Sequence, residues 1–205
     1  MELFSPIGQF IQKLNPDSIS ANRKKLLQPL VKYMQEKVDE DASINLNFIC
    51  THNSRRSILG QVWAQTLANY FQLKQFHSYS GGTESTAVFP MTVNTLEETG
   101  FKTSTVTAGD NPHYTIKFAQ NEPALIAFSK TFDNETNPAA KFAAIMTCSQ
   151  ADEDCPFIAG AETRIPVTFE DPKTFDNSPQ QAEKYHNTSL QMATELFYVF
   201  SQIKS

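Results

Sequence analysis

The spacing of apolar side chains divides the chain into an N-terminal helical part and a longer part in which strands and helices alternate. Ser20 or Asn22 is placed to cap a helix in the first part, and Pro29 to kink it. The apolar residues that predict this helix recur at steps of three and four, the spacing of one helical face: Leu26, Leu27, Leu30, Val31, Met34 and Val38. The charged run at 36–41 predicts the solvated end of the helix. We therefore expect an N-terminal helical extension over residues 1–43.

The pattern changes at Ile44, where a short apolar run leads into Cys50 as a buried parallel strand would. A polar stretch at 51–55 follows. A helical stripe comes next, made of Leu59, Val62, Trp63, Thr66, Leu67 and Tyr70. This order predicts a strand, a loop and a helix, with Cys50 at the carboxyl end of the strand. Ligands bind at such strand ends in open α/β sheets, so this loop is the first candidate for a site.

Strand-like runs recur after this unit, at 76–80, 113–119, 124–130, 142–147 and 165–168. Gly81 and Gly82 predict a turn after the first of these runs. The second and third are separated by four residues that include Pro123, and they predict a β-hairpin inserted at about 108–140.

Two further helices complete the pattern. One begins after Pro90 and stops at Gly100, and the last carries its apolar side from Leu190 to Ile203. Repeated strand–helix units imply a mostly parallel sheet with right-handed crossovers. The expected fold class is a flavodoxin-like, three-layer α/β sandwich with a four-stranded parallel sheet over residues 44–205. The N-terminal helices and the inserted hairpin would be additions to it.

Composition excludes several classes of protein. With 205 residues, 40% of them hydrophobic and 16 of them Phe, the chain is not expected to be disordered. Its net charge of −5 would repel phosphates, which argues against nucleic acid as a partner. No run has the length of a membrane span, and the start lacks the pattern of a signal peptide. We therefore expect a cytoplasmic protein with no membrane partner, whose 3 Cys act, if they act, as reduced thiols.

The chemistry-bearing motif is Cys-x5-Arg-Ser at residues 50–57, the thiol loop. A loop between a strand end and a helix start points successive N–H groups inward and forms an anion site. Such surroundings lower the pKa of a thiol from about 8.5 to roughly 3.5–7.5. Arg56 can grip two oxygens as a planar fork, Ser57 can donate to the sulfur of Cys50, and Asn53 tolerates a left-handed backbone. The candidate oxyanion-binding residues are Thr51, His52, Asn53, Ser54, Arg55, Arg56 and Ser57.

Adjacent residues leave a helix about 100° apart, so Arg55 and Arg56 cannot both face the anion. We assign the anion to Arg56 and expect Arg55 at the rim or paired with an acid. The competing interpretation of Cys50 is a small buried hydrophobe at a strand end. The strand before it and the helix after it favour the site.

The thiol loop resembles the phosphate-binding loop of low-molecular-weight protein tyrosine phosphatases. It is more similar still to that of thioredoxin-coupled arsenate reductases, which share their fold. Three further stretches agree in order over about residues 44–205: 79–84 with 88–90, 146–156, and 169–172. Simple phosphatases of this fold lack paired cysteines in the second stretch, so Cys148 and Cys155 are the specific signal for the reductases.

The resemblance implies an enzyme that reduces arsenate to arsenite without a cofactor. Cys50 would attack arsenic while Asp171 protonates the leaving oxygen. Cys148 would then attack Cys50, Cys155 would attack Cys148, and thioredoxin would reduce the resulting disulfide. Some reductases bind potassium through a Glu at the place where this chain has the neutral Gln61.

Other interpretations of the cysteines stay open. The acidic stretch at 149–154 is typical of a mobile surface loop. Without a relay, Cys148 would be a buried residue at a strand end and Cys155 an exposed residue unrelated to it. Zinc is a poor alternative, because the cysteines have no His at ligand spacing. The chain could also be a phosphatase acting through a cysteinyl-phosphate on Cys50, or an oxyanion-binding or redox-sensing module without catalysis.

Overall fold

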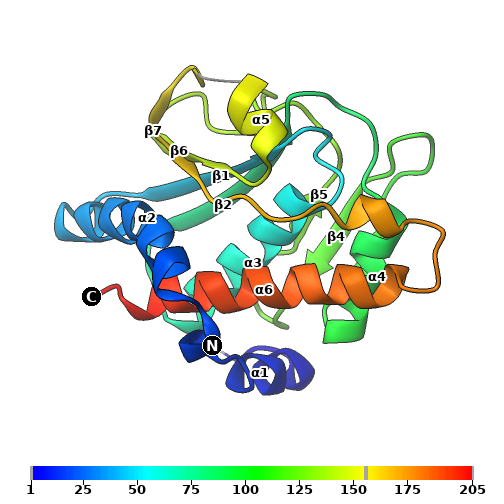
Figure 1. Ribbon diagram of the computed structural model, residues 1–205, viewed down its shortest axis with the longest axis horizontal. Helices are drawn as coiled ribbons and strands as arrows, with labels where there is room; N and C mark the ends of the chain where they lie inside the picture. Colours follow the sequence, from blue (N-terminus) through cyan, green and yellow to red (C-terminus); the bar gives the residue numbers. More distant parts are fainter. Residues whose placement is uncertain (1, 155–156, 205) are drawn as a thin grey trace.

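A four-stranded parallel sheet forms the centre of the computed structural model, which describes residues 2–154 and 157–204 (Figure 1). Its strands lie in the order β2-β1-β6-β7. Their bounds are β1 (Ile44–Cys50), β2 (Phe76–Gly82), β6 (Phe142–Met146) and β7 (Ala161–Pro166). The strand order places β1 between two neighbours, so Cys50 ends an interior strand. The expected fold class is confirmed.

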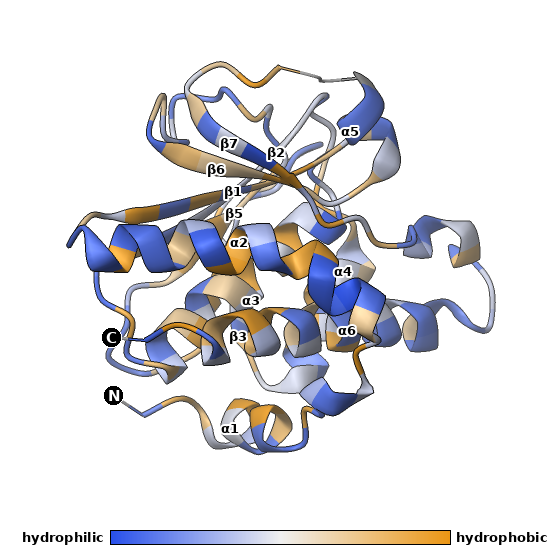
Figure 2. Cartoon of the chain, turned by 60° about the vertical axis from the view of Figure 1, so that its left-hand side comes forward, coloured by the Kyte–Doolittle hydropathy of each residue, from blue (hydrophilic) through white to orange (hydrophobic). Residues whose placement is uncertain are grey.

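Helices cover both faces of this sheet. α2 (Ala21–Asp39), α3 (Arg56–Tyr70) and α6 (Gln181–Ser201) lie on one face, and the short α5 (Ser149–Asp154) lies on the other (Figure 1). The strands β1 and β6 are mostly apolar (Figure 2), and every residue of β6 is buried. Phe48 packs in the large core cluster toward the three helices, whereas Ile49 packs in a smaller cluster that includes both Cys50 and Cys148. The two cysteines therefore share one layer of the molecule.

The N-terminal part consists of α1 (Ser5–Gln12), the 3-10 helix η1 (Pro16–Ser18) and α2. Ser20 caps α2, because its Oγ accepts a hydrogen bond from the N–H of Arg23 at 3.2 Å, whereas Asn22 lies inside the helix. Leu27 is fully buried, but Leu26 is 52% exposed. The prediction that Leu26 belongs to the buried face is wrong, since it lies about 100° around the helix from Leu27.

A second, antiparallel sheet is inserted after α4 (Pro90–Thr99), which ends at Gly100 with φ 110° as expected. It consists of β3 (Lys102–Thr105), β4 (Tyr114–Lys117) and β5 (Leu125–Ala127), in that order. The pair β4–β5 confirms the predicted hairpin. The sequence did not predict β3, because its residues, Lys-Thr-Ser-Thr, show no apolar alternation.

The predicted turn at Gly81 and Gly82 is wrong, because β2 continues through both residues and Gly82 pairs with Cys50. A Cβ on Gly82 would lie 2.6 Å from the carbonyl oxygen of Thr51 and 2.8 Å from the nitrogen of Asn53. Glycine is required here so that β2 can approach the thiol loop, not so that the chain can turn.

Two more boundaries differ from the sequence prediction. The acidic stretch at 149–154 is the helix α5 rather than a loop, and its Ala151 is fully buried. β7 starts at Ala161, before the predicted run at 165–168, and the 3-10 helix η2 (Pro172–Phe175) follows it. No helix in the described ranges has the length and apolar character needed to cross a membrane.

Candidate active site

The thiol loop turns its carbonyl groups outward, toward the segments that surround it. Four of them accept hydrogen bonds: Cys50 from Thr83 N (3.1 Å), Thr51 from Glu84 N (2.8 Å), His52 from Ser129 Oγ (2.7 Å) and Ser54 from Phe89 N (3.1 Å). Within residues 2–154 and 157–204, no backbone N–H of residues 51–55 donates to a protein acceptor. Asn53 adopts the predicted left-handed conformation, with φ 45°. Successive free N–H groups in such a bend form a concavity suited to an anion.

The sulfur of Cys50 lies at the base of this loop, beside a hydroxyl donor. Cys50 Sγ is 3.1 Å from Ser57 Oγ, and both residues are buried. Asn53 Nδ2 donates to the same Oγ at 2.8 Å, which leaves the hydroxyl proton of Ser57 available to the sulfur. Ser57 is in the first turn of α3, where the helix dipole also favours negative charge.

Arg56 and Asp171, which the sequence analysis selected separately, form an ion pair. Arg56 Nη2 lies 2.6 Å from Asp171 Oδ2, and Nη1 donates to the carbonyl of Phe169 at 2.9 Å. The Nε of Arg56 is buried and has no hydrogen-bond partner in the described part of the chain. A guanidinium with one free buried donor is prepared to bind a further oxygen atom. Asp171 also accepts from the N–H of Lys173 at 3.0 Å, which fixes its carboxylate at the start of η2.

The neighbouring Arg55 is held by a different set of side chains. Its Nε donates to Tyr185 Oη at 2.5 Å, and its Nη2 lies 2.6 Å from Asp176 Oδ2. Its guanidinium also lies 4.2 Å from the ring centre of Phe89. Burial opposes the charge, but the contacts with Tyr185 and Asp176 outweigh it and raise the pKa of Arg55. The side chain is therefore paired with an acid, and the backbone N–H of Arg55 remains available to an anion.

The sequence analysis missed the partners of Arg55. Tyr185 donates to Asp176 Oδ1 at 2.6 Å, so the three side chains form a closed network. Asp176 is 121 residues away from Arg55 in the chain. Nothing in the local sequence marks this pairing, because it depends on how η2 and α6 pack beside the loop.

Cys148 lies close to the thiol loop, directly after β6. It is 2% exposed, and its Sγ is 3.5 Å from Thr51 Oγ1. The N–H of Ala151 donates to the same sulfur at 3.4 Å, which connects it to α5. The structure therefore brings a second thiol to the residue that follows Cys50. Cys155, the third predicted thiol, lies outside the described residues.

The remaining predicted positions lie at the edge of the loop or behind it. His52 Nε2 is 3.7 Å from a carboxylate oxygen of the exposed Glu84, at the rim. Gln61 Oε1 accepts from Ser80 Oγ at 2.6 Å, and its Nε2 donates to the carbonyl of Ser78 at 3.3 Å. The amide of Gln61 is therefore occupied by protein groups. Among the described residues, no group of three or more His, Cys, Asp or Glu side chains is arranged to hold a metal ion.

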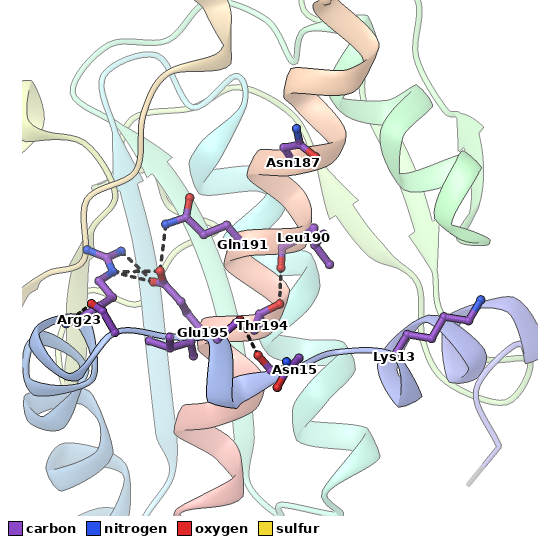
Figure 3. Close-up of a pocket in the computed structure, with 11 residues that line it drawn as sticks. Lys13, Asn15, Arg23, Asn187, Leu190, Gln191, Thr194 and Glu195 are labelled. Carbon is purple, nitrogen blue, oxygen red and sulfur yellow. Dashed lines mark hydrogen bonds and ion pairs between the residues drawn. The ribbon is translucent and has the colours of Figure 1, made fainter.

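A buried ion pair supports the segment that carries Asp171. Arg23, from α2, binds Glu195 of α6 with an Nη2–Oε2 distance of 2.7 Å and also donates to the carbonyl of Thr168 at 3.0 Å. Figure 3 shows Arg23 and Gln191 converging on Glu195, beside a cavity of about 580 Å³. The residues that line this cavity come from 13–23 and 187–195, so it does not contain the thiols. The ion pair anchors the chain three residues before Asp171.

Comparisons with known proteins identify the fold. No family model and no curated protein matches the chain. Among solved structures, an arsenate reductase in the phosphate-binding state has a TM-score of 0.50 and 20% identity, covering 78% of this chain and 99% of that one. An arsenate reductase in the oxidized state has a TM-score of 0.51 and 19% identity, covering 78% and 98%. A low-molecular-weight phosphotyrosine phosphatase from Vibrio cholerae O395 has a TM-score of 0.50 and 12% identity, covering 78% and 95%. The chain therefore has the α/β fold of the low-molecular-weight phosphotyrosine phosphatases, which arsenate reductases share.

Proposed function

We propose that the chain is an arsenate reductase in which Cys50, Cys148 and Cys155 act in turn and thioredoxin restores the thiols. The observation that carries this proposal is the position of Cys148, whose sulfur is buried 3.5 Å from Thr51 Oγ1. A phosphatase needs one nucleophilic thiol, whereas a two-electron reduction needs a second thiol within reach of the first. Two electron-rich sulfurs beside one anion site fit a reductase better.

The first step forms a bond between Cys50 and arsenic. Arsenate would lie in the loop with its oxygens bound by the free N–H groups of residues 51–55 and by Arg56. The thiolate of Cys50 attacks arsenic(V), and one oxygen leaves as water after receiving a proton from Asp171. Asp171 is within reach of the anion because its carboxylate is bound to Arg56 at 2.6 Å.

The second step transfers the electrons. The thiolate of Cys148 attacks the sulfur of Cys50, the sulfur–arsenic bond breaks, and its electron pair reduces arsenic(V) to arsenic(III). Arsenite leaves and a Cys50–Cys148 disulfide remains. Cys155 then attacks Cys148, which releases the Cys50 thiolate and forms a 148–155 disulfide. The dithiol of thioredoxin reduces that disulfide, so the sum is arsenate plus dithiol giving arsenite, disulfide and water.

The helix α5 must rearrange during this sequence, because it contains the residues between Cys148 and Cys155. Contacts with Cys148 and with β7 hold it in the present conformation. The N–H of Ala151 donates to the Cys148 sulfur, and Asp152 forms an ion pair with Arg164 of β7 at 2.6 Å. A disulfide on Cys148 would move its sulfur toward the new partner and away from the first contact, which favours opening of the helix.

A phosphatase acting through a cysteinyl-phosphate on Cys50 is the second candidate function. The Arg56–Asp171 pair favours it, since an anion-binding fork beside a proton donor suffices for phosphate-ester cleavage. The two functions are separated by measuring arsenate-dependent oxidation of reduced thioredoxin beside hydrolysis of p-nitrophenyl phosphate. The wild type is compared with Cys148→Ser and Cys155→Ser.

The reductase proposal predicts a different outcome for each variant. Cys148→Ser should abolish arsenate reduction and leave hydrolysis of the aryl phosphate within a factor of a few. Cys155→Ser should complete one turnover and retain a Cys50–Cys148 disulfide, detectable by peptide mass mapping. Normal turnover of arsenate by both variants would reject the relay. If the wild type shows neither activity but binds phosphate, the chain is a binding module instead.

A further inference from the structure

A cavity of about 600 Å³ lies behind the thiol loop, between β2 and the inserted antiparallel sheet. It is separate from the loop, because none of residues 50–57 lines it. Its lining combines polar side chains with three apolar or aromatic ones, Tyr79, Ile126 and Phe128. Its volume is in the range typical of sites for small molecules.

One extended segment, residues 126–130, separates this cavity from the thiol loop. Ile126, Phe128 and Lys130 all line the cavity, as alternate residues of an extended chain do. Ser129 points the other way, since its Oγ donates to the carbonyl of His52 at 2.7 Å. The N–H of Lys130 donates to Asn53 Oδ1 at 3.1 Å. The side chain of Lys130 therefore lines the cavity, while its backbone N–H binds a residue of the thiol loop.

Lys130 is an exception among the buried cations of the molecule. The residue is 4% exposed, and its Nζ lies 4.5 Å from the ring centre of Phe128. No ion pair involves Lys130 in the described part of the chain, although the carboxylate-bearing Glu135 lines the same cavity. Burial lowers the pKa of Lys130 to about 8. Lysines are almost never this buried without a paired anion, so the charge requires an explanation.

We propose that this cavity binds a small organic monoanion, a carboxylate on an apolar or aromatic body, with Lys130 as its counter-ion. A single ammonium group balances a single negative charge. The carboxylate of Glu135 at the same wall would repel a dianion such as a phosphate monoester. Ile126 and Phe128 offer the apolar surface for the body of the ligand. Burial raises the pKa of Tyr79, so its phenol stays protonated and can donate to the bound carboxylate.

The test uses benzoate as the probe and benzamide, its uncharged analogue of nearly the same shape, as the matched control. Binding to the full chain at pH 7 is followed by the amide signals in ¹H–¹⁵N correlation spectra. Benzoate should shift signals of residues 126–137, and benzamide should bind at least about tenfold more weakly, the factor that 1.4 kcal/mol of charge interaction gives. Equal binding of the two probes, shifts confined to residues 50–57, or no shift with millimolar benzoate would overturn the proposal.

Variants of Lys130 identify the counter-ion. Lys130→Met should weaken benzoate binding at least about tenfold. Lys130→Arg keeps the charge and should bind benzoate within a factor of a few of the wild type, and Lys74→Met, at an exposed lysine, is the surface control. Unchanged affinity in Lys130→Met would reject the role of this residue, and its spectrum shows directly whether it folds.

The pH dependence gives a second readout. Benzoate affinity of the wild type should fall as the pH rises from 7 to 9, whereas that of Lys130→Arg should not, because a guanidinium stays charged. The other titratable groups that line the cavity are Tyr79, His113 and Glu135, and they are common to both proteins. Parallel pH profiles would therefore contradict the proposal. The proposal does not depend on the reaction at Cys50.

Discussion

In the part of the chain that the structure describes, buried positive charges are paired with carboxylates on one side of the 126–130 segment and unpaired on the other. On the side of the thiol loop, Arg55 and Arg56 each meet an aspartate oxygen at 2.6 Å. On the cavity side, Lys130 has no ion pair among the described residues, and its Nζ lies 4.5 Å from the ring centre of Phe128. A desolvated charge that has its partner contributes to a fixed geometry, whereas one without a partner lowers stability until something binds it. On our proposal, pairing rather than burial alone distinguishes a structural cation from one that binds a ligand.

The largest expected effect separates the two arginines of the loop. Arg56→Lys should lower kcat/KM about 100- to 1000-fold, because an ammonium cannot hold two oxygens as the fork does. Arg55→Lys should lower it less than about tenfold, since its side chain is committed to Tyr185 and Asp176. Steady-state assays with arsenate and with p-nitrophenyl phosphate measure both. A greater loss in Arg55→Lys would reverse the assignment of the anion ligand.

The next effect is on stability rather than on rate. Asp176→Asn should lower the free energy of unfolding by about 3–5 kcal/mol, because it leaves the buried guanidinium of Arg55 without its counter-charge. Tyr185→Phe removes two hydrogen bonds from the same network, one from Arg55 and one to Asp176, and should cost about 1–3 kcal/mol. Urea denaturation measures both. Loss of activity with no loss of stability in Asp176→Asn would mean that this network belongs to the reaction.

Removing the charge of Lys130 should have the opposite effect on the free energy of unfolding and raise it. Between pH 8 and 10.5 the unfolded chain holds a proton that the folded chain has released, so the stability of the wild type should rise over this range. Lys130→Met lacks this titration. It should be more stable than the wild type by about 3 kcal/mol at pH 7, with the difference vanishing near pH 10.5. A constant difference across this range, measured by urea denaturation at each pH, would show that Lys130 is not desolvated.

The smallest effect concerns the two aromatic contacts. Phe128 lies under Lys130 and Phe89 lies under Arg55, at 4.5 and 4.2 Å. A double-mutant cycle of Lys130→Met with Phe128→Leu should give a coupling free energy of about 1 kcal/mol. The cycle of Arg55→Met with Phe89→Leu should give less, because Asp176 already supports that cation. Equal coupling in the two cycles would remove the distinction between them.

The features that could be predicted from the sequence are those that depend on residues close together in the chain. The strand ending at Cys50, the loop and the helix after it are contiguous, and each carries its own signal. The left-handed conformation of Asn53 was likewise predicted, from a residue type that tolerates it. The cysteines were expected at one edge of the sheet, but the order of the strands, which decides how close Cys148 comes to Cys50, cannot be read from the chain. The structure shows its cause, since β1 and β6 are parallel neighbours whose carboxyl ends share one sheet edge.

Features that depend on distant segments were not predicted. Gly81 and Gly82 have the composition of a turn, but the constraint on Gly82 is the approach of the loop backbone, which is a tertiary contact. Lys130 ends the predicted strand-like run at 124–130, where a solvent-exposed lysine would be ordinary, and only the fold around it excludes water from it. The partner of Arg55 is equally hidden, because any of the 22 acidic residues could have been chosen. Long-range packing decides all three.

The bond from Arg23 to the carbonyl of Thr168 has a consequence for cooperativity. It joins residues 145 positions apart, so it ties the beginning of the chain to the segment that leads to Asp171. Opening of α2 would release that carbonyl and leave Glu195 buried without its counter-charge. The N-terminal helices should therefore unfold together with the segment that carries Asp171. Amide hydrogens of α2 and of β7 should therefore exchange with solvent at similar rates. The helix α2, which the sequence presents as an addition to the α/β core, therefore contributes to the stability of the segment that carries Asp171.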